Sequence, residues 1–348
     1  MLIGMTYDLR ADYLVAGFGK EETAEFDRPD TIDSIEAALQ ELGHQTERIG
    51  HAPALASRLA RGQRWDLVFN IAEGLAGASR EAQVPAMLEA FQIACTFSDP
   101  LISALTLDKA LTKRVLRDLG LPTAPFAVIE SVGELARFDL AFPVFVKPLA
   151  EGTAKGIDGH SRVDSARQLK AVVERVLAEF HQPALVEAYL PGREFTVGII
   201  GTGSSAKAVG TLEIVLLAEA EPHAYTYVNK ERCEELCQYA LAPRDCATRA
   251  EDLALGAWRG LGCRDAGRVD LRADAEGELQ ILEVNPLPGL HPAHSDLPIL
   301  CTAVGMPYLE LIGRIVASAE TRVRAPDPRL GALGGGSFAA EQSAAVPK

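Results

Sequence analysis

Short apolar stretches alternate with stretches of helical periodicity over the first hundred residues of the chain. Residues 2–6 and 65–70 are short and largely apolar, which is typical of buried strands. Between them, apolar residues recur every three or four positions after Asp30 or Thr31, either of which is a suitable N-cap, and the pattern stops at Gly43. This spacing predicts an amphipathic helix. Strand, helix and strand in this order predict a parallel sheet covered by helices over residues 1 to about 100.

The rest of the chain continues this mixture of strands and helices. Further strands are predicted at 142–148, 184–190, 194–197 and 267–271, with one more ending near Asn285, and further helices at 107–120 and 165–180. The last two strands flank Asp274–Gly277, whose composition is typical of a hairpin turn. Residues 323–348 lack apolar periodicity, and we expect them to form a disordered tail.

The hairpin gives the first indication of chemistry. Glu283 and Asn285 are two positions apart on one strand, so both point to the same face. The facing strand carries Asp270 beside Arg268. Three oxygen donors that converge next to an arginine are a natural site for Mg²⁺ bound to polyphosphate oxygens, because Mg²⁺ takes few protein ligands and completes its shell with phosphate and water.

Two other features favour phosphate binding. Lys109 follows Asp108, the expected N-cap of a helix, and a lysine at the positive end of a helix is easier to understand if an anion joins it. Residues 151–156 hold two glycines with Thr153 and Lys155, a composition that suits a loop folded over phosphate oxygens. The loop matches neither the Walker nor the GxGxxG spacing, and a solvated lysine and a simple hairpin connection remain alternatives.

Polar residues also mark two candidate pockets. Glu187 and Glu194, on neighbouring strands, have the donors and acceptors to bind a nucleoside, although exposed strand glutamates are the alternative. Glu73, Arg80 and Glu81 follow the strand at 65–70, at the sheet edge where open α/β sheets bind ligands. A solvated loop is the alternative there. The charged segment 7–27 is either a loop that covers the substrate or a surface excursion.

Composition narrows the class of protein. The 348 residues carry a formal net charge of −14, which argues against nucleic acid as a partner. No apolar run reaches the roughly 18 residues that span a bilayer, and the N-terminus lacks a signal-peptide core, so we expect a cytoplasmic protein without a membrane segment. Six cysteines without CxxC pairs are expected as buried free thiols, with Cys233 and Cys237 the pair that keeps another possibility open.

Five motifs in this order resemble the ATP-grasp superfamily, and within it the D-alanine–D-alanine ligase family, over about residues 66–318. They are LDKALTK at 107–113, FPVFVKPLAEGTAKG at 142–156, LVEAYLPGREFTVGI at 185–199, GRVDL at 267–271 and LEVNPLPGL at 282–290. The resemblance implies an α/β (α+β) ATP-grasp fold. Its parts would be an N-terminal parallel-sheet, Rossmann-like domain at 1–100, a central small lobe at 101–186 and a catalytic lobe at 187–322.

The resemblance also implies roles for individual residues. Those expected to bind ATP are Lys109, Lys147, Gly152, Thr153, Lys155, Gly156, Glu187, Ala188, Leu190, Glu194 and Lys230. Asp270, Glu283 and Asn285 would hold two Mg²⁺ ions, with Mn²⁺ as a substitute. Arg268 and the backbone N–H of Gly289 would stabilise the charge that develops on the reacting acyl group, and Lys230 would reach the γ-phosphate.

The chain departs from the family where substrates bind. Tyr7-Asp8-Leu9-Arg10 stands where the family has a glycine- and serine-rich motif with a glutamate for the first ammonium. The segment 290–296 is altered as well, although His294 and Ser295 are candidates to receive a substrate carboxylate. Simple loop residues are the alternative for His291 and His294. Glu73, Arg80 and Glu81 remain further substrate candidates.

These observations predict an ATP-dependent carboxylate–amine ligase. It would join two amino acids through an acyl phosphate and release ADP and phosphate. One alternative is an ATP-grasp ligase whose acceptor is not an amino acid, and another is a catalytically silent ATP-binding regulator. The resemblance is compatible with a homodimer, and the identity and stereochemistry of the two substrates stay open.

Overall fold

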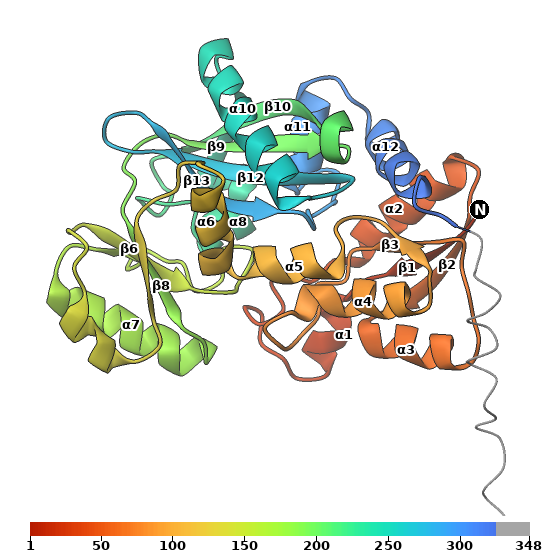
Figure 1. Cartoon of the computed structure of the whole chain (residues 1–348), viewed down its shortest axis with the longest axis horizontal. Coiled ribbons are helices and arrows are strands. Elements are labelled where there is room, and N and C mark those ends of the chain that lie inside the picture. Colours follow the sequence, from red (N-terminus) through yellow and green to blue (C-terminus); the bar gives the residue numbers. More distant parts are fainter. Residues whose placement is uncertain (325–348) are drawn as a thin grey trace, which may run out of the picture.

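Three β-sheets, each formed by one stretch of the chain, make up the framework of the molecule (Figure 1). The computed structural model describes residues 1–324. The predicted tail at 323–348 therefore lies almost entirely outside the described residues.

The first sheet is parallel, as the sequence predicts. Its strand order is β2 (Gln45–Gly50), β1 (Leu2–Thr6), β3 (Leu67–Asn70) and β4 (Ala94–Cys95). The helices of this part are α1 (Arg10–Val15), α2 (Pro29–Glu41), α3 (Ala52–Ala60) and α4 (Gln83–Ala90), with the 3₁₀ helix η1 (Arg80–Ala82) before α4.

The predicted start of α2 is wrong by about two residues. Its N-cap is Arg28 rather than Asp30 or Thr31. Pro29 occupies the first helical position, where its fixed φ suits the helix and its missing N–H is not needed.

The second sheet is antiparallel and lies between residues 126 and 188. Its order is β5 (Phe126–Ile129), β8 (Ala184–Ala188), β6 (Val144–Pro148) and β7 (Arg162–Val163). The helical elements beside it are α7 (Ala166–Phe180) and the 3₁₀ helix η2 (Val132–Arg137). The apolar side of α7, which the sequence predicts, is buried against this sheet.

The third sheet is antiparallel and carries the predicted hairpin. Its order is β11 (Cys237–Leu241), β10 (Lys207–Leu216), β9 (Glu194–Ile200), β12 (Ala266–Ala273) and β13 (Leu279–Asn285). The other elements of this part are η3 (Gly203–Ser205), α8 (Tyr227–Glu231), α9 (Cys233–Leu236), α10 (Arg244–Leu261) and α11 (Asp296–Ala303).

Helices α10 and α11 cover opposite faces of the third sheet. Trp258 of α10 is fully buried among the residues of β9 and β12 that point toward it. A Cβ at Gly198 would come within 2.7 Å of the Leu300 side chain of α11, so α11 packs directly on the other face. Gly267 lets β12 pass Trp258, because a Cβ there would lie 2.5 Å from the indole ring.

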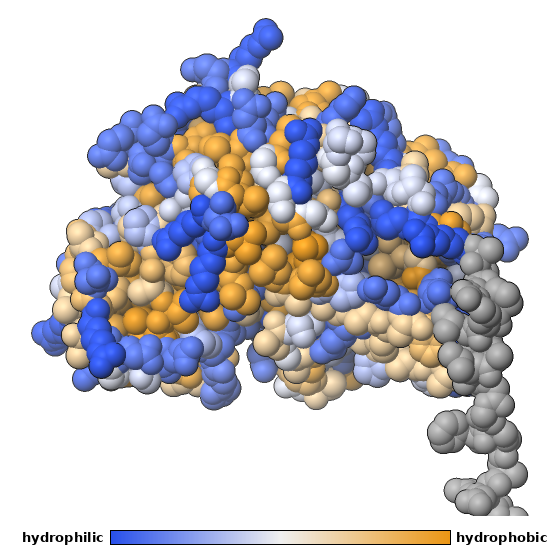
Figure 2. Space-filling model, viewed as in Figure 1, coloured by the Kyte–Doolittle hydropathy of each residue, from blue (hydrophilic) through white to orange (hydrophobic). Residues whose placement is uncertain are grey.

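The remaining helices join the three sheets. These are α5 (Pro100–Leu107), α6 (Lys109–Asp118) and α12 (Tyr308–Glu320). The end of the described chain returns to its beginning, since Leu311, Ile312 and Ile315 of α12 share a core with Ile3 and Ile32. On the face shown in Figure 2, an apolar band lies over α5 and α6, where Leu101 is 73% exposed.

No single helix in residues 1–324 is long and apolar enough to cross a membrane. Helices α11 and α12 together approach the required length and composition, but they meet at an angle of 115°.

Candidate active site

The hairpin of β12 and β13 brings the predicted metal ligands together. Asp270 faces Glu283 across the two strands, and Arg268 faces Asn285. The Asn285 carboxamide donates to Asp270 Oδ2 at 3.1 Å and to Glu283 Oε1 at 3.4 Å. The Thr196 hydroxyl of β9 donates to Asp270 Oδ1 at 2.6 Å. The three side chains therefore share one side of the sheet, as alternation predicts.

The two carboxylates differ in their ionisation. Burial raises the pKa of Asp270 to about 6, and the charge of Glu283 adds to this effect, while Arg268 opposes it. Burial also acts to raise the pKa of Glu283, but Lys109, Lys230 and Lys147 outweigh it and hold that pKa well below its usual range. Glu283 is thus an anion at neutral pH.

This donor set fits Mg²⁺. Its oxygens are hard donors, and the rest of an octahedral shell is left for phosphate and water. The orientation of the Asn285 amide is assigned from its hydrogen bonds to the two carboxylates. A rotation of the amide by 180° would turn its oxygen toward a metal ion bound there. Within residues 1–324, no three His, Cys, Asp or Glu side chains form a metal-binding group by themselves.

Arg268 is held beside this group by two acids. Its NH1 donates to Asp296 Oδ2 at 2.7 Å, and its Nε lies 3.5 Å from Asp270 Oδ2. These acids, with Glu283, raise the pKa of Arg268 above its ordinary value although burial acts to lower it. Gly289, the predicted partner of Arg268, lies with it along the larger cavity described below. A Cβ at Gly289 would lie 2.8 Å from Ser295 Oγ.

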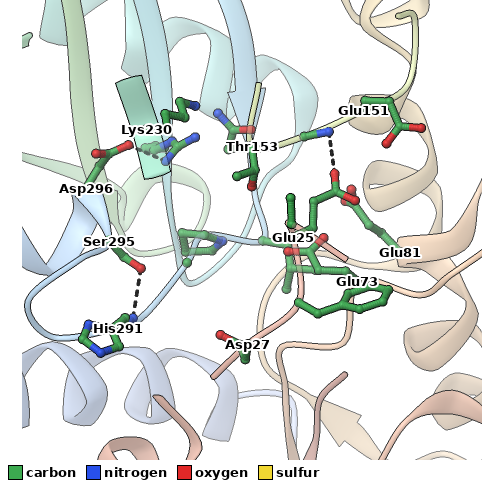
Figure 3. Close-up of a pocket in the computed structure, with 18 of the residues that line it drawn as sticks. Glu25, Asp27, Glu73, Glu81, Glu151, Thr153, Lys230, His291, Ser295 and Asp296 are labelled. Atoms are coloured by element: carbon green, nitrogen blue, oxygen red, sulfur yellow. Dashed lines mark hydrogen bonds and ion pairs between the residues drawn. The ribbon is translucent and has the colours of Figure 1, made fainter. Parts of the chain in front are cut away.

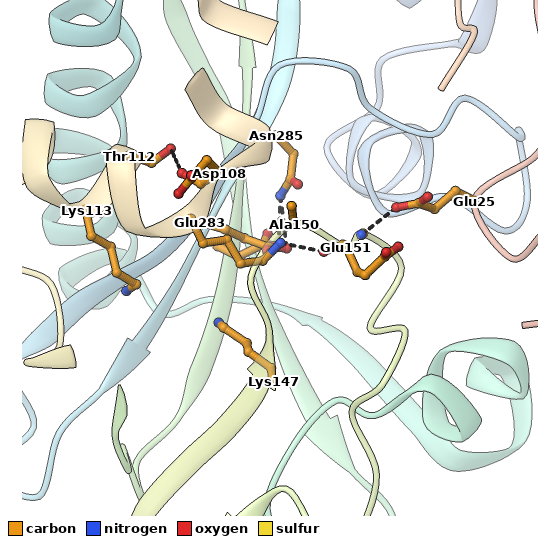
Figure 4. Close-up of polar contacts among 12 residues, drawn as sticks. Glu25, Asp108, Thr112, Lys113, Lys147, Ala150, Glu151, Glu283 and Asn285 are labelled. Carbon is orange, nitrogen blue, oxygen red and sulfur yellow. Dashed lines mark hydrogen bonds and ion pairs between the residues drawn. The ribbon is translucent and has the colours of Figure 1, made fainter. Parts of the chain in front are cut away.

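Two of the lysines predicted to bind phosphate, Lys109 and Lys147, come from different elements, and Figure 4 shows Lys147 on β6. Lys109 begins α6 after Asp108, whose carboxylate accepts from Leu111 N as the N-cap. Its Nζ lies 3.4 Å from Glu283 Oε2 and donates to the Glu151 carbonyl at 2.5 Å. Lys147, at the end of β6, lies 2.7 Å from Glu187 Oε2.

Glu187 also pairs with Lys113, a residue that the sequence did not lead us to predict for the site. Lys113 Nζ lies 2.6 Å from Glu187 Oε1 and donates to Thr123 Oγ1 at 2.7 Å. Burial opposes ionisation of Glu187, yet Lys113 and Lys147 lower its pKa to about 2. The position of Lys113, one helical turn after Lys109, could have suggested that it shares the site. No local pattern could identify Glu187 as its partner, because the two residues are more than 70 positions apart.

A small cavity of about 90 Å³ lies between the second and third sheets. All the residues predicted for the nucleoside line it, namely Glu187, Ala188, Leu190 and Glu194. Tyr189 joins them and stacks on Phe145 with ring centroids 6.4 Å apart. Glu194 is paired with Arg272 at 3.2 Å. The cavity therefore combines apolar side chains with charged groups that could bind the polar parts of a nucleotide.

The glycine-rich loop is docked on the N-terminal part of the chain. Gly152 N donates to Glu25 Oε1 at 2.5 Å, and Lys155 Nζ lies 3.0 Å from Glu25 Oε2. Arg80 donates to both Glu25 oxygens at 3.0 Å and to the Ala150 carbonyl at 2.8 Å. Burial acts against the charge on Glu25, but Arg80 and Lys155 lower its pKa below the ordinary value.

These contacts change the picture of two predicted residues. Lys155 lines the small cavity but is paired with Glu25 and Glu151. Arg80 lines neither of the two cavities, because it is turned toward the loop and buried. Thr153 lines the larger cavity. Gly156 lines neither and has a φ of +72°, and a Cβ there would come within 2.5 Å of Pro148.

A larger cavity of about 290 Å³ lies beside the metal-ligand group (Figure 3). Of the substrate candidates, Glu73, Glu81, His294 and Ser295 line it. Ser295 Oγ accepts from His291 N at 3.0 Å. The His294 Nδ1 lies 3.8 Å from Cys233 Sγ, and the contact with this thiol, ahead of the opposing effect of burial, raises the pKa of His294.

The N-terminal segment supplies a further wall of this cavity. Arg10, Asp27 and Arg28 line it, and Arg10 lies 3.5 Å from Glu231 of α8. Of the two readings of segment 7–27, the substrate-covering loop agrees with this position. Glu25 and Asp27 were only weak candidates from sequence, because the segment has no periodicity and its partners lie far along the chain.

The two cavities meet at charged side chains. Both are lined by Lys109, Glu151, Tyr225, Lys230, Glu283 and Asp296. Lys230 Nζ lies 5.0 Å from the centroid of the Tyr225 ring. Two ligands, one in each cavity, would therefore approach each other next to Lys109, Lys230 and Glu283.

Comparison with known proteins is consistent with this geometry. Residues 115–317 match the family model described as D-ala D-ala ligase C-terminus. The chain is 35% identical over 301 residues to the uncharacterized protein y4sG of Sinorhizobium fredii, covering 83% of this chain and 87% of that one. It is 34% identical over 296 residues to a D-alanine–D-alanine ligase of Bordetella petrii, covering 84% of each chain.

The fold is also similar to solved structures. The D-alanine–D-alanine ligase from Bacillus anthracis complexed with ATP superposes with a TM-score of 0.68 at 22% identity, covering 93% of this chain and 98% of that one. A second structure of the ligase from this organism gives 0.71 at the same identity and coverage.

Proposed function

The chain belongs to the D-alanine–D-alanine ligase family of ATP-grasp enzymes, which form C–N bonds, and we propose that it joins two amino acids through an acyl phosphate. The first amino acid would bind in the larger cavity with its carboxylate toward Lys230 and Arg268. ATP would bind in the small cavity with its γ-phosphate toward Lys109. The observation that carries this proposal is the set of charged residues shared by the two cavities.

The shared residues suit phosphoryl transfer to a carboxylate. A carboxylate is a poor electrophile, and phosphorylation gives it a good leaving group that an amine can displace. Charge spreads over the transferred phosphoryl in the transition state, so the protein acts by positioning and electrostatics. Lys109, Lys147 and Lys230 would hold phosphate oxygens. Arg268 and the Gly289 N–H would stabilise the oxyanion that forms when the amine attacks.

The remaining groups would bind and shield ATP. Asp270, Glu283 and Asn285 would hold Mg²⁺, which when bound neutralises the polyphosphate charge. We extend the proposal to two Mg²⁺ ions, with Mn²⁺ as a substitute. Ala188 and Leu190 would contact the base, Glu194 the ribose, and the loop at 152–156 would cover the phosphates. The resemblance further supports a cytoplasmic homodimer as the working assembly.

Release of phosphate from ATP and Mg²⁺ tests the proposed reaction. Amino acids of both configurations are supplied singly and in pairs. We expect release that depends on a pair, accompanied by a new amide of matching mass. Release that no pair stimulates, in a protein that still binds ATP, would contradict the ligase and favour the silent regulator.

The shared charged site is tested by a matched pair of variants. Glu283→Gln should lower turnover by about 100-fold or more, because it removes a metal ligand and a charge from the reaction centre. Glu276→Gln changes an exposed glutamate in the turn of the same hairpin and should keep wild-type turnover. Equal turnover in the two variants would remove the basis for the assignment.

A further inference from the structure

Asp296 lies where the two cavities meet, and the proposed reaction assigns it no role. It is the first residue of α11, it lines both cavities, and it is only 7% exposed. Figure 3 shows it beside the larger cavity together with Lys230 and Ser295. Helix α11 packs on the third sheet, where its Leu300 would lie 2.7 Å from a Cβ at Gly198. The backbone of Asp296 is therefore held in place by a packed helix.

One oxygen of this carboxylate is occupied and the other is free. Oδ2 accepts a hydrogen bond from Arg268 NH1 at 2.7 Å. Among residues 1–324, Asp296 Oδ1 has no hydrogen-bond donor, and it is not one of the unpaired side-chain atoms that protein encloses completely. Oδ1 is therefore open to the cavities. A largely buried carboxylate oxygen without a partner is unfavourable, and a ligand that donates a hydrogen bond to it would offset this cost.

The other acids at the junction are already engaged. Of the described residues, those that line both cavities include two further carboxylates, Glu151 and Glu283. Glu151 accepts from Gln182 at 2.7 Å and pairs with Lys155, and Glu283 is a proposed metal ligand. Asp296 is thus the acid of this shared set that has an oxygen left for a substrate.

The proposed reaction needs such an oxygen. An amine acceptor enters as an ammonium ion, which has no lone pair and cannot attack a carbonyl carbon until it loses a proton. In their charged forms, Lys230 and Arg268 offer hydrogens but no acceptor atom. His294 can accept a proton, but it lines the larger cavity only, and its Nδ1 faces Cys233 Sγ at 3.8 Å. Asp296 is bound to Arg268, the residue proposed to stabilise the oxyanion of this attack.

We propose that Asp296 is the group that receives the attacking amine. Its Oδ1 accepts a hydrogen bond from the ammonium of the second amino acid and then takes one proton from it, while its Oδ2 keeps Arg268 directed at the acyl group. This inference rests on the proposed ligase function and adds a catalytic residue to the same site.

The amide-forming step then balances in protons and electrons. One proton moves from the ammonium nitrogen to Asp296 Oδ1, and the lone pair left on nitrogen forms the C–N bond to the acyl carbon. The carbonyl π electrons move to the oxygen, whose negative charge is stabilised by Arg268. When they return, the bond from this carbon to the phosphate oxygen breaks. Phosphate leaves with the electron pair and takes the second proton from nitrogen, and Asp296 loses its proton to water.

Asp296→Asn separates the two roles of the carboxylate. The amide oxygen of asparagine can still accept from Arg268, but the side chain can no longer take a proton. A single turnover is run with ATP, Mg²⁺ and the amino-acid pair that gives the fastest phosphate release, and is stopped at short times. ADP reports formation of the acyl phosphate, and the amide reports its use. We expect ADP to form within about 3-fold of the wild-type rate and the amide to form roughly 100-fold more slowly, as the loss of a general base predicts.

The outcomes separate this proposal from the ligase function. Equal slowing of ADP and amide in Asp296→Asn would indicate a role in the fold or in ATP binding and would overturn the proposal. Amide formation at the wild-type rate would overturn it as well. Both results leave the ligase standing, because the wild type forms the amide in each. A wild type that forms neither ADP nor amide with any pair contradicts the ligase itself.

An uncharged nucleophile provides a second measurement. Hydroxylamine is largely neutral near pH 7, so it attacks an acyl phosphate without a base and gives a hydroxamate. Asp296→Asn should form the hydroxamate within about 3-fold of the wild-type rate, although its amide formation is roughly 100-fold slower. A loss of hydroxamate as large as the loss of amide would contradict the proposal.

Two further variants serve as comparisons for Asp296→Asn. Asp296→Glu keeps a carboxylate and should form the amide roughly 10-fold faster than Asp296→Asn. Glu235→Gln changes an exposed acid of α9 that pairs with Arg232 on the surface, and it should keep the wild-type rates of both products. Equal rates of amide formation in Asp296→Glu and Asp296→Asn would show that this carboxylate is not the proton acceptor.

Discussion

Glu187 shows how a single carboxylate pairs with two buried lysines in this site. Its carboxylate lies between Lys113 and Lys147, and all three side chains are buried. Burial lowers the pKa of Lys113. Burial acts in the same direction on Lys147, but the charges of Glu187, Glu283 and Glu194 together outweigh it and raise the pKa of Lys147. Removing the acid would leave two lysines facing each other without a counter-charge.

Glu187→Gln should therefore destabilise the fold strongly. We expect a loss of about 3–5 kcal/mol in the free energy of unfolding, the range for breaking a buried ion pair from one side. Glu310→Gln is the matched control, because Glu310 pairs with Arg314 on the surface and such pairs contribute about 0.5 kcal/mol or less. Urea unfolding measures both, and a similar small loss in each would refute the structural role of Glu187.

Asp27 gives the fold a pH dependence of a definite sign. Burial, and then the charge of Asp8, raises its pKa from 3.8 to about 8. Between about pH 4 and pH 8 the unfolded chain ionises this group while the folded protein keeps its proton. The contribution of Asp27 to stability is therefore complete below pH 4 and is lost as the pH rises through 8.

Asp27→Asn should remove this dependence. We compare the stability of the variant with that of the wild type at each pH. The difference in free energy of unfolding, variant minus wild type, should be about 1–3 kcal/mol higher at pH 8 than at pH 5, since each unit of pKa shift corresponds to about 1.4 kcal/mol. Chemical denaturation at the two pH values gives the comparison. If the difference in free energy of unfolding between the variant and the wild type does not change with pH, Asp27 has its ordinary pKa in the folded protein.

Among the elements, the glycine-rich loop is the one whose position depends most on distant contacts. Its motif and its place after β6 could be predicted from sequence. Its docking could not, because Glu25 lies 127 residues from Gly152 in a segment without periodicity. Lys155 was predicted to bind ATP and Arg80 to bind a substrate, but the partner that each one has in the folded protein depends on distant segments.

Glu25→Gln tests whether this docking serves ATP binding. The change leaves Arg80 and Lys155 without their shared counter-charge, so the loop should open more readily. We expect the KM for ATP to rise by roughly 10-fold, with faster hydrogen exchange at the Gly152 amide. Glu22→Gln alters an exposed acid of the same segment and should affect neither quantity. An unchanged KM and exchange rate in Glu25→Gln would show that the loop is held by other contacts.

The regular elements were the part of the fold that local patterns could predict. The hairpin of β12 and β13 forms around Asp274–Gly277 as expected, and its register brings Asp270 opposite Glu283. Alternation within a strand is a local property, so it survives folding unchanged. The start of α2 was predicted too late because Asp30 and Thr31 are common N-cap residues. The helix begins earlier, at Pro29, because proline is well suited to the first helical position.

At the scale of the whole molecule, the site exists only where the parts meet. The small cavity takes walls from the second and third sheets, and the larger one adds the N-terminal segment and the loop after β13. Helix α12 returns to pack on the first sheet through Leu311 and Ile315. The residues expected to bind ATP lie within short motifs that can be recognised along the sequence. Asp27, Glu73 and Glu81 of the larger cavity come from separate segments that share no such motif.

The central claim is that Lys109, Lys230 and Arg268 bring a substrate carboxylate against the γ-phosphate of ATP. It is tested most directly with a first amino acid whose carboxylate carries ¹⁸O. If the carboxylate attacks the γ-phosphorus and the amine then displaces phosphate, one labelled oxygen must end in the inorganic phosphate. Mass spectrometry of the phosphate from one round of turnover should show this transfer in stoichiometric amount. Unlabelled phosphate, formed together with the amide, would contradict the acyl phosphate route.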